Sequence, residues 1–235
     1  MRAISVIIPV YMEADNVRDA VANVLWALDE AKVEDYELLI IDCLRRDGTH
    51  DGTPEIADAL AKENGRIRVF HNPYINLGAK YWMGVDAAKF PYCILVPGDN
   101  ELMKEALRDI LLHLGEADML ISYPANTEVR PLTRRILSKT YVALMNGSTG
   151  LNLRYYNGSC VHRTDMLRKI TDREDNLAYM AKLLIQMVKE GCSYKEIPIY
   201  LQQRKGNPSV LTVGNFLSVG KSIFGVFWKY RILRK

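Results

Sequence analysis

The sequence of 235 residues is poor in cysteine and histidine, with four of each. Cys43, Cys93, Cys160 and Cys192 stand far apart, no two of them form a CxxC pair, and no histidine has metal-ligand spacing. This distribution supports neither a zinc site nor a disulfide framework. We therefore expect free, buried thiols in a reducing compartment.

Long apolar runs are also missing. No stretch reaches the roughly 18 uninterrupted apolar residues of a conventional membrane-spanning helix. The opening MRAISVIIPVY becomes apolar almost at once, but it lacks the longer apolar region and the small-residue cleavage site of a signal peptide. We interpret it as the first strand of the fold.

Acidic residues are absent after Glu196. Seven of the 31 basic residues lie beyond that position without any acidic neighbour, which leaves 24 basic against 28 acidic residues in the first 196. The body of the protein is therefore mildly acidic, and its positive charge is concentrated in the tail. This asymmetry requires a partner or another physical reason.

Short apolar, β-branched runs alternate with helical patterns through the first half. This order is typical of βαβ units around a parallel sheet, and the length suits one large α/β unit. At 53–54, Thr-Pro resembles a helix N-cap followed by proline at the first helical position. The expected strands span 4–10, 37–41, 66–71 and 92–96, and the expected helices begin near 17, 53 and 79.

Acidic side chains follow three of these strands, in loops 11–15, 42–52 and 97–101. The carboxyl ends of parallel strands meet at one edge of a sheet, where ligands bind. Carboxylates gathered there repel one another unless a cation or a donor-rich ligand lies between them. Taken singly, Asp99 and Glu101 are explained equally well as solvated loop residues.

Four stretches, in order, resemble one protein family. SVIIPVYMEADNV, IIDCLRRDGTHDGT, NLGAKYWMGVDAA and ILVPGDNEL are similar to the nucleotide-sugar half of family 2 glycosyltransferases with the GT-A fold. The resemblance implies a mostly parallel sheet flanked by helices over 1–209. It divides this domain into a nucleotide-sugar half at 1–121 and an acceptor half at 122–209, with a basic amphipathic segment at 210–235.

By position, the resemblance implies that Pro9, Tyr11 and Glu13 hold the nucleotide, together with Asp42 and either Asp47 or Asp51. The second loop is several residues longer than is usual in the family and inserts Arg45 and Arg46. Which of Asp42 and Asp47 contacts the base stays open.

The family's D-x-D motif binds a divalent cation, usually Mg²⁺ or Mn²⁺, and hard oxygen ligands suit these ions. In this sequence Pro97 stands where the first aspartate is expected. Asp99 and Glu101 are then the implied metal ligands, and Gly98 allows close approach of the backbone.

The acceptor half offers several charged candidates. Arg135 and Lys139, spaced i and i+4 on an expected helix over 131–145, either face a phosphate or form a solvated surface. Asp175 lies where many family members carry a general base, although helix capping explains it equally well. The stretch at 194–209 resembles the arm that closes the family's active site, which implies that Arg204 and Lys205 neutralise an acceptor phosphate.

The tail at 211–235 has the pattern of an amphipathic helix, with aromatic and aliphatic side chains on one face and Lys221 and Lys229 on the other. This pattern suits the plane of an anionic membrane. Docking on the body of the protein or on another subunit is the alternative. Because the tail lacks acids, we favour the membrane.

Taken together, these features predict an inverting, metal-dependent transferase that resembles polyprenyl-phosphate mannose or glucose synthases. The expected donor is a GDP- or UDP-hexose, the acceptor a lipid phosphate, and the location the inner face of the cytoplasmic membrane, with no nucleic acid partner. The alternatives are a transferase acting on a hydroxyl, with Asp175 as base, and a nucleotide-binding protein that has lost transfer activity.

Overall fold

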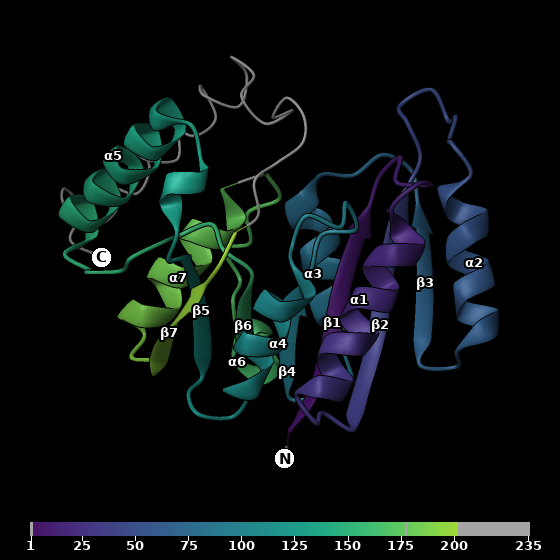
Figure 1. The fold of residues 1–235 in the computed structure, drawn as a ribbon, viewed down its shortest axis with the longest axis horizontal. Helices are drawn as coiled ribbons and strands as arrows, with labels where there is room; N and C mark the ends of the chain where they lie inside the picture. The colour runs from purple at the N-terminus through teal and green to yellow at the C-terminus, as the bar shows by residue number, and fades with distance from the viewer. Residues whose placement is uncertain (1, 177, 202–235) are drawn as a thin grey trace.

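The computed structural model describes residues 2–176 and 178–201, which form a single seven-stranded sheet with helices on both faces (Figure 1). The strand order is β3-β2-β1-β4-β6-β5-β7. All neighbouring pairs are parallel except those of β6, which runs antiparallel to β4 and β5. The predicted α/β class with a mostly parallel sheet is confirmed.

The strands are β1 (Ala3–Val10), β2 (Asp35–Cys43), β3 (Ile67–Asn72), β4 (Tyr92–Leu95), β5 (Met119–Pro124), β6 (Cys160–Arg163) and β7 (Tyr194–Ile199). The helices are α1 (Val17–Glu30), α2 (Thr53–Glu63), α3 (Leu77–Ala87), α4 (Lys104–Leu112), the short η1 (Thr127–Val129), α5 (Leu132–Thr149), α6 (Thr164–Leu167) and α7 (Tyr179–Lys189). The four strands expected in the first half therefore all occur, and they are neighbours in the sheet.

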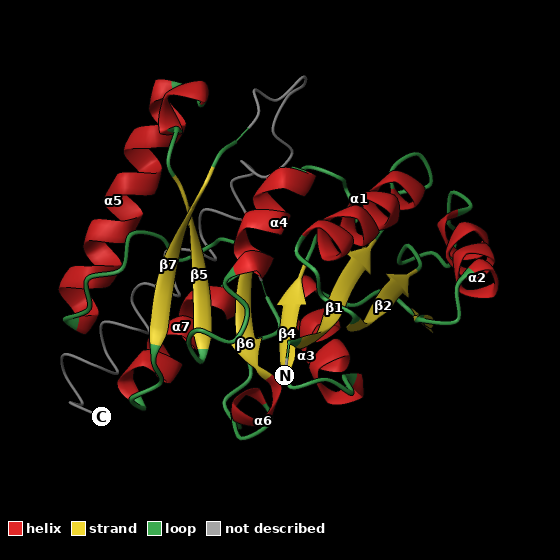
Figure 2. Cartoon of the chain, turned by 60° about the horizontal axis from the view of Figure 1, so that its bottom comes forward, coloured by secondary structure: helices red, strands yellow, loops and turns green. Residues whose placement is uncertain are grey.

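Alternation along β1 explains the two layers of the core. Ile4, Val6 and Ile8 pack on the face covered by α1, α2 and α4, whereas Ile7 packs on the opposite face with α3 and α7. All eight residues of β1 are buried because this strand has helices on both sides. Figure 2 shows α1 and α4 on one side of the strands and α3 and α7 on the other.

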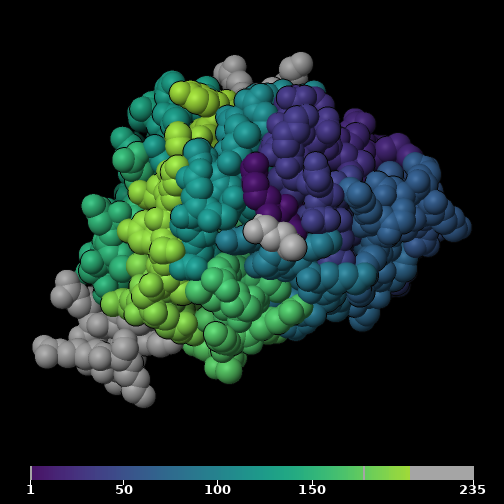
Figure 3. Space-filling model, turned by 90° about the horizontal axis from the view of Figure 1, so that it is seen from below, coloured from purple at the N-terminus to yellow at the C-terminus, as the bar shows by residue number. Residues whose placement is uncertain are grey.

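The two ends of the sheet differ. The chain begins at the lower end of β1, and Figure 3 shows these first residues at the surface seen from below. The carboxyl ends of β1, β2 and β4 lie at the opposite end, with the three acidic loops. This arrangement follows from the parallel pairing of the three strands.

The start of α2 differs from the expectation. Gly52, with φ of 99°, is the N-cap, and Thr53 is already helical. Asp51 supplies the cap interaction instead, because its Oδ1 accepts the Thr53 N–H at 3.0 Å. The Thr53 hydroxyl instead accepts a hydrogen bond from the Glu13 N–H in the loop after β1.

The acceptor half contains two further corrections. α5 extends to Thr149, four residues past its expected end. α7 begins at Tyr179, so Asp175 lies in the preceding loop and not in a first helical turn. That loop stays outside the helix because the Asp175 carbonyl accepts the Gly78 N–H at 2.9 Å. Among the described residues, no helix is both long and apolar enough to cross a membrane.

The predicted division at 121/122 falls inside β5, in the middle of the shared sheet. The predicted boundary at 209/210 lies outside the described residues, as does the whole amphipathic tail. Both boundaries stay predictions.

Candidate active site

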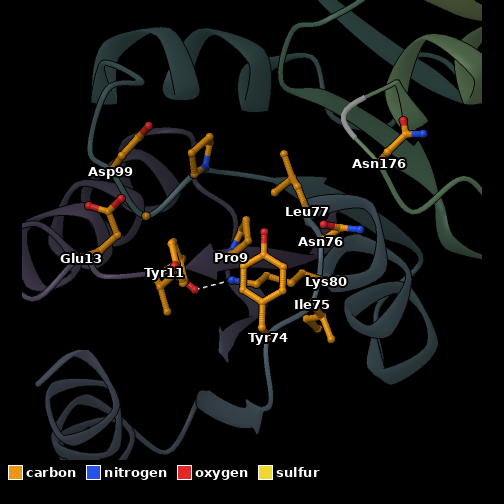
Figure 4. Close-up of a pocket in the computed structure, with 13 residues that line it drawn as sticks. Pro9, Tyr11, Glu13, Tyr74, Ile75, Asn76, Leu77, Lys80, Asp99 and Asn176 are labelled. Carbon is orange, nitrogen blue, oxygen red and sulfur yellow. Dashed lines mark hydrogen bonds between the residues drawn. The ribbon is translucent and has the colours of Figure 1, made fainter. Parts of the chain in front are cut away.

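A cavity of about 530 Å³ lies at the carboxyl ends of β1 and β4, a volume within the range of roughly 300–1,000 Å³ that is typical of small-molecule sites. Four segments enclose it: the end of β1 with its loop, the β3–α3 connection with the first turn of α3, the loop after β4, and Asn176 (Figure 4). The described residues that line it are Pro9, Val10, Tyr11, Glu13, Tyr74, Ile75, Asn76, Leu77, Lys80, Pro97, Gly98, Asp99 and Asn176.

The loop after β1 is held by the loop that precedes α2. Met12 has a φ of 59°, a left-handed conformation that is uncommon for a residue other than glycine. The Glu13 N–H donates to the Thr53 hydroxyl at 2.8 Å, and the Ala14 N–H donates to Asp51 Oδ2 at 3.1 Å. These bonds fix the turn that brings Tyr11 and Glu13 to the cavity.

Asp51 therefore has a structural task. Burial alone would raise its pKa, but hydrogen bonds from the Thr53 hydroxyl and from the N–H groups of Ala14 and Thr53 outweigh burial and hold the pKa below the ordinary value. An ionised Asp51 joins the second acidic loop to the first. It does not itself line the cavity.

Two tyrosines form the aromatic part of the wall. The rings of Tyr11 and Tyr74 meet edge to face, with centroids 5.7 Å apart, and both side chains remain partly exposed. The Arg46 guanidinium lies 4.5 Å from the centroid of the Tyr74 ring. Exposed aromatic faces beside a cavity are suited to stacking on a planar base.

Lys80 is a site residue that we did not expect from the sequence. It is only 3% exposed, and its Nζ donates to the Val10 carbonyl at 2.5 Å, 5.7 Å from the Tyr11 ring centroid. One turn later, an added Cβ at Gly84 would lie 2.6 Å from Ile7, so α3 packs directly on β1. One feature of the sequence could have identified Lys80: it stands four positions before Gly84, on a helix face whose other residues are buried.

Two carboxylates share the cavity near Lys80. The pKa of Glu13 is raised, first by burial and then by the negative charges of Asp99 and Asp51, although a hydrogen bond from Asn16 and the charge of Lys80 act in the opposite direction. Figure 4 shows Glu13 and Asp99 on the same side of the pocket. A carboxylate pair in this position favours a bound cation.

The loop after β4 passes very close to the end of β1. The Gly98 N–H donates to the Pro9 carbonyl at 3.2 Å, and an added Cβ at Gly98 would lie 2.5 Å from Val10 Cγ1. Asn100 then adopts a left-handed conformation, with φ of 57°, and its side chain accepts a hydrogen bond from Asn23 at 2.8 Å. This geometry requires glycine at 98 and turns Asp99 toward the cavity.

The residues at this edge of the sheet supply part of the ligand set of a divalent cation. Within 2–176 and 178–201, no three His, Cys, Asp or Glu side chains gather closely enough to form a complete metal site. Mg²⁺ is commonly held by one or two carboxylates together with the phosphates of a substrate. The carboxylates of Glu13 and Asp99 match that donor set, because a diphosphate would complete it.

The segment before α7 closes the cavity on the side of α3. Besides the Gly78–Asp175 bond, Trp82 Nε1 donates to the Glu174 carbonyl at 2.9 Å. An added Cβ at Gly78 would lie 2.6 Å from the Asp175 carbonyl carbon, so glycine is needed for this contact. The Asp175 side chain is exposed, and the residue of this segment that lines the cavity is Asn176.

Five of the predicted site residues come together in the cavity: Pro9, Tyr11, Glu13, Gly98 and Asp99. Others lie elsewhere, and the structure does not bring them to the cavity wall. Glu101 and Asp47 are exposed, the Asp47 carboxylate accepts hydrogen bonds from Thr49, and Arg135 lies on α5.

Asp42 is buried at the end of β2, where its Oδ2 lies 3.2 Å from His71 Nδ1. His71 Nε2 in turn contacts Asp58 at 3.0 Å. Asp42 thus links β2 to its neighbour β3 and to α2. Arg204 and Lys205 are outside the described residues, so their predicted roles stay predictions.

The fold and the cavity define an α/β protein with a candidate site for a nucleotide diphosphate at the carboxyl edge of its sheet. The sequence model of "Glycosyl transferase family 2" matches residues 5–173. The chain therefore belongs to glycosyltransferase family 2, and the predicted family is confirmed.

A curated relative is the glycosyltransferase AglD of Haloferax volcanii, 25% identical over 239 aligned positions. The alignment includes 97% of this chain but 38% of the relative, so the chain spans well under half the length of that protein.

Solved structures with the same fold include glucosyl-3-phosphoglycerate synthase from Mycobacterium tuberculosis. Its complex with UDP has a TM-score of 0.72 and 15% identity, covering 96% of this chain and 80% of that chain. Its complex with Mn²⁺, UDP and phosphoglyceric acid has a TM-score of 0.67 and 15% identity, covering 97% and 78%. TarS 1–349 from S. aureus, bound to UDP-GlcNAc, has a TM-score of 0.59 and 17% identity, covering 96% and 66%. These similarities establish the GT-A fold.

Proposed function

We propose that the protein transfers a hexose, with inversion, from a GDP- or UDP-hexose to a polyprenyl-phosphate-type lipid at the membrane surface. The observation that carries this proposal is one cavity that combines aromatic rings, a buried lysine and two carboxylates. The aromatic rings suit a nucleotide base, the lysine suits negatively charged phosphates, and the carboxylates suit the cation that accompanies the phosphates. Family membership and the nucleotides bound to the structural neighbours support the same donor class.

In this proposal Tyr11 and Tyr74 stack against the base. Lys80 Nζ has three donor positions, of which the Val10 carbonyl accepts one. A second can bind a carbonyl oxygen of the base or a phosphate oxygen of the donor. A charged donor of this kind, held in place by burial, contributes about 1.5–3 kcal/mol to such a hydrogen bond.

Mg²⁺ or Mn²⁺ is the proposed cofactor, held by Asp99 together with Glu13, which share the cavity. Glu101, the second predicted ligand, follows on the same loop outside the cavity wall and reaches the cation only if that loop moves on binding. When bound, the cation acts as a Lewis acid that stabilises the leaving diphosphate. Mn²⁺ and Mg²⁺, each bound with UDP in the mycobacterial neighbour, support this assignment. Gly98 provides the space that the close approach of this loop requires.

The transfer itself is a displacement at the anomeric carbon. An acceptor oxygen forms the new C–O bond on one face of the sugar, while the bond to the diphosphate breaks on the opposite face and its electron pair leaves with the diphosphate. A phosphate acceptor is already ionised at neutral pH, so no protein base is needed. Arg204, Lys205 and Arg135 are the proposed phosphate partners, and segment 211–235 holds the protein to the inner face of the cytoplasmic membrane.

Hydroxyl transfer is the second candidate, because the Asp175 segment is fixed against α3 beside the cavity. An alcohol must lose its proton as it attacks, and an exposed Asp175 can accept it. A protein that binds nucleotide without transferring sugar is the third candidate, suggested by Pro97 in place of an acid.

The first experiment is a thermal-shift screen of nucleotide sugars with Mn²⁺ and with EDTA. A ligand that binds only the folded state raises the melting temperature in proportion to its occupancy. We expect a metal-dependent shift with one donor, lost in Asp99→Asn and retained in Asp109→Asn, whose carboxylate lies on α4 outside the cavity. A donor shift that is unchanged by EDTA and by Asp99→Asn contradicts the metal assignment.

The second experiment measures sugar transfer by the wild type and by Asp175→Asn to two acceptors in parallel, a polyprenyl phosphate and the hydroxyl of a lipid-linked saccharide. Transfer that survives the substitution supports the phosphate acceptor. Loss of turnover with donor binding intact supports the hydroxyl acceptor. Donor binding without release or transfer of sugar under any of these conditions refutes the enzymatic function.

A further inference from the structure

α5 presents an unusual number of large apolar side chains to solvent. The exposed fractions are 64% for Leu132, 54% for Ile136, 40% for Leu137 and 48% for Leu144. Of the 18 residues of this helix, only Met145, Ser148 and Thr149 are buried. Exposed aliphatic side chains gathered on one element usually mark a contact with a partner or a membrane.

The arrangement around the helix is ordered. At 3.6 residues per turn, the four aliphatic residues fall within one exposed arc of about 140°, which we call the outer side of α5. Leu132 and Ile136 lie opposite the buried residues, and Leu137 and Leu144 lie at the edge of the arc next to the buried Ser148. The other residues of this outer side are Thr133, Thr140, Ala143 and Gly147, all uncharged. Lys139 and Arg135 lie along one border of this side, whereas Arg134 lies on the inward side of the helix and is half-buried. An uncharged arc with cations along one margin differs from a normal solvated helix face.

The position of α5 leaves this outer side accessible from outside the fold. Figures 1 and 2 show α5 at the edge of the molecule, beyond β7. This edge of the sheet is opposite the edge formed by β3, where α2 lies. Leu132, Ile136 and Leu137 lie in its first two turns, which follow η1 and the carboxyl end of β5. β5 runs parallel to β7, and its carboxyl end lies at the same end of the sheet as that of β4.

The charge of this region has one sign. From Val129 to Thr164 the chain contains six basic residues and no acidic residue. Among the described residues, Arg134, Arg135 and Lys139 have no ion-pair partner. The pKa of Arg134 is lowered, first by burial and then by the charge of Arg130, so these two guanidinium groups are close enough to repel each other.

We propose that the outer side of α5 lies on an anionic lipid surface, with its four aliphatic side chains among the acyl chains and its border cations at the headgroups. Helices of this type lie in the interface plane, with the apolar side about 5–10 Å below the headgroups. Each cation near such a surface adds attraction to anionic lipid, and long basic side chains reach the headgroups from the border of an apolar face.

A second copy of the chain is a poorer occupant for this surface. A twofold interface would bring the same patch together from both subunits. Arg135 and Lys139 of one copy would then lie close to the same cations of the other copy, with no acid on α5 to offset them. The proposal goes beyond the nucleotide-sugar site and the tail at 211–235, and it does not depend on which acceptor the enzyme uses.

The test is binding of the full chain to vesicles of phosphatidylcholine and phosphatidylglycerol in a two-to-one mixture, with phosphatidylcholine vesicles as reference. Ile136→Glu combined with Leu144→Glu places two acids at exposed positions, so the fold should be retained. Leu112→Glu is the matched control, because Leu112 on α4 is 49% exposed, as Leu144 is 48% exposed. We expect the double variant to lose about tenfold or more in vesicle affinity and the control to lose little.

A second measurement separates α5 from the tail. A polarity-sensitive dye on Leu144→Cys, in a Cys192→Ser background, reports the surroundings of α5 directly, since Cys43, Cys93 and Cys160 are buried. A shift to apolar emission with anionic vesicles, absent for the same dye on Leu112→Cys, supports the proposal.

Two results overturn it. In the first, the double variant binds vesicles as tightly as the wild type and the dye emission does not shift, whereas the tail variant Lys221→Glu with Lys229→Glu no longer binds vesicles. In the second, the wild type self-associates and the double variant is a monomer, but both bind vesicles equally well. Neither result affects donor binding in the cavity, so a failure here is distinct from a failure of the proposed function.

Discussion

A fully buried histidine makes the stability of this protein strongly dependent on pH. His162 lies on β6, paired with Cys93 of β4 on one side and Met119 of β5 on the other, and has no exposed surface. Its Nδ1 lies 3.2 Å from the Tyr81 hydroxyl, and its Nε2 has no hydrogen-bond partner among the described residues. Burial lowers the pKa of His162 from 6.5 to about 3.

The lowered pKa means that the unfolded chain takes up a proton at a pH where the folded protein does not. Acidification therefore stabilises the unfolded state relative to the native state, and the free energy of unfolding falls as the pH drops from about 6.5 toward 3. The difference between the two pKa values corresponds to about 5 kcal/mol in total, at 1.36 kcal/mol per unit. Between pH 7 and pH 5 this one group should remove about 2 kcal/mol.

The assay is urea unfolding of the wild type and of His162→Gln at several pH values from 7 to 5. Glutamine does not titrate, and its amide can still reach the Tyr81 hydroxyl. We expect the wild type to lose about 2 kcal/mol more than the variant over this interval. Subtracting the two curves removes the contribution of every other titrating group.

His71→Gln is a control of opposite sign. Burial lowers the pKa of His71, but its hydrogen bonds to Asp58 and Asp42 outweigh burial, and the pKa is raised. His71 therefore stabilises the native state at low pH and loses this effect as the pH rises through its folded pKa. Removing it should make the acid loss steeper. Parallel curves for the wild type and His162→Gln would refute the reasoning, because they would mean that the buried imidazole does not resist protonation.

Three further changes test the cavity. Gly78→Ala should displace the Asp175 segment and cost about 1–3 kcal/mol of stability, whereas Gly65→Ala, with open space around its Cβ, should cost much less in the same unfolding assay. Lys80→Met should weaken donor binding about tenfold or more in calorimetry, with Lys62→Met on α2 as a control that binds normally. Because the pKa of Glu13 is raised, metal-dependent donor binding should weaken on mild acidification, at a higher pH than an ordinary carboxyl would require, and Glu13→Gln should remove that pH dependence. An unchanged melting curve, an unchanged affinity or an unchanged pH profile would contradict the respective prediction.

Local pattern was sufficient for the first half of the sheet. Val6 to Val10 and Leu38 to Ile41 are continuous apolar runs because both strands are covered by helices on both faces, and such strands can be located without tertiary information. Their parallel pairing follows from the helices between them. The cavity at their carboxyl ends could be anticipated from the same argument, and Tyr11, Glu13 and Asp99 lie there.

Other features depend on contacts between distant residues. Thr53 was expected to cap α2, but its hydroxyl instead accepts the N–H of Glu13, 40 positions earlier. Asp175 was expected in a helix, yet its carbonyl is bound by Gly78, nearly 100 positions earlier. No local preference of either segment contains this information.

Sequence alone determined the α/β class, the family and the loops that carry the site, because hydrophobic period and motif order are local properties of the chain. Only the tertiary structure decided that Lys80 enters the cavity, that Asp42 and Asp51 brace neighbouring elements, and that α5 leaves an apolar side uncovered. These outcomes depend on which surfaces meet when the helices pack on the sheet. That meeting is set by the shape and burial of many residues together, such as the contact of Gly84 with Ile7, and not by any one segment.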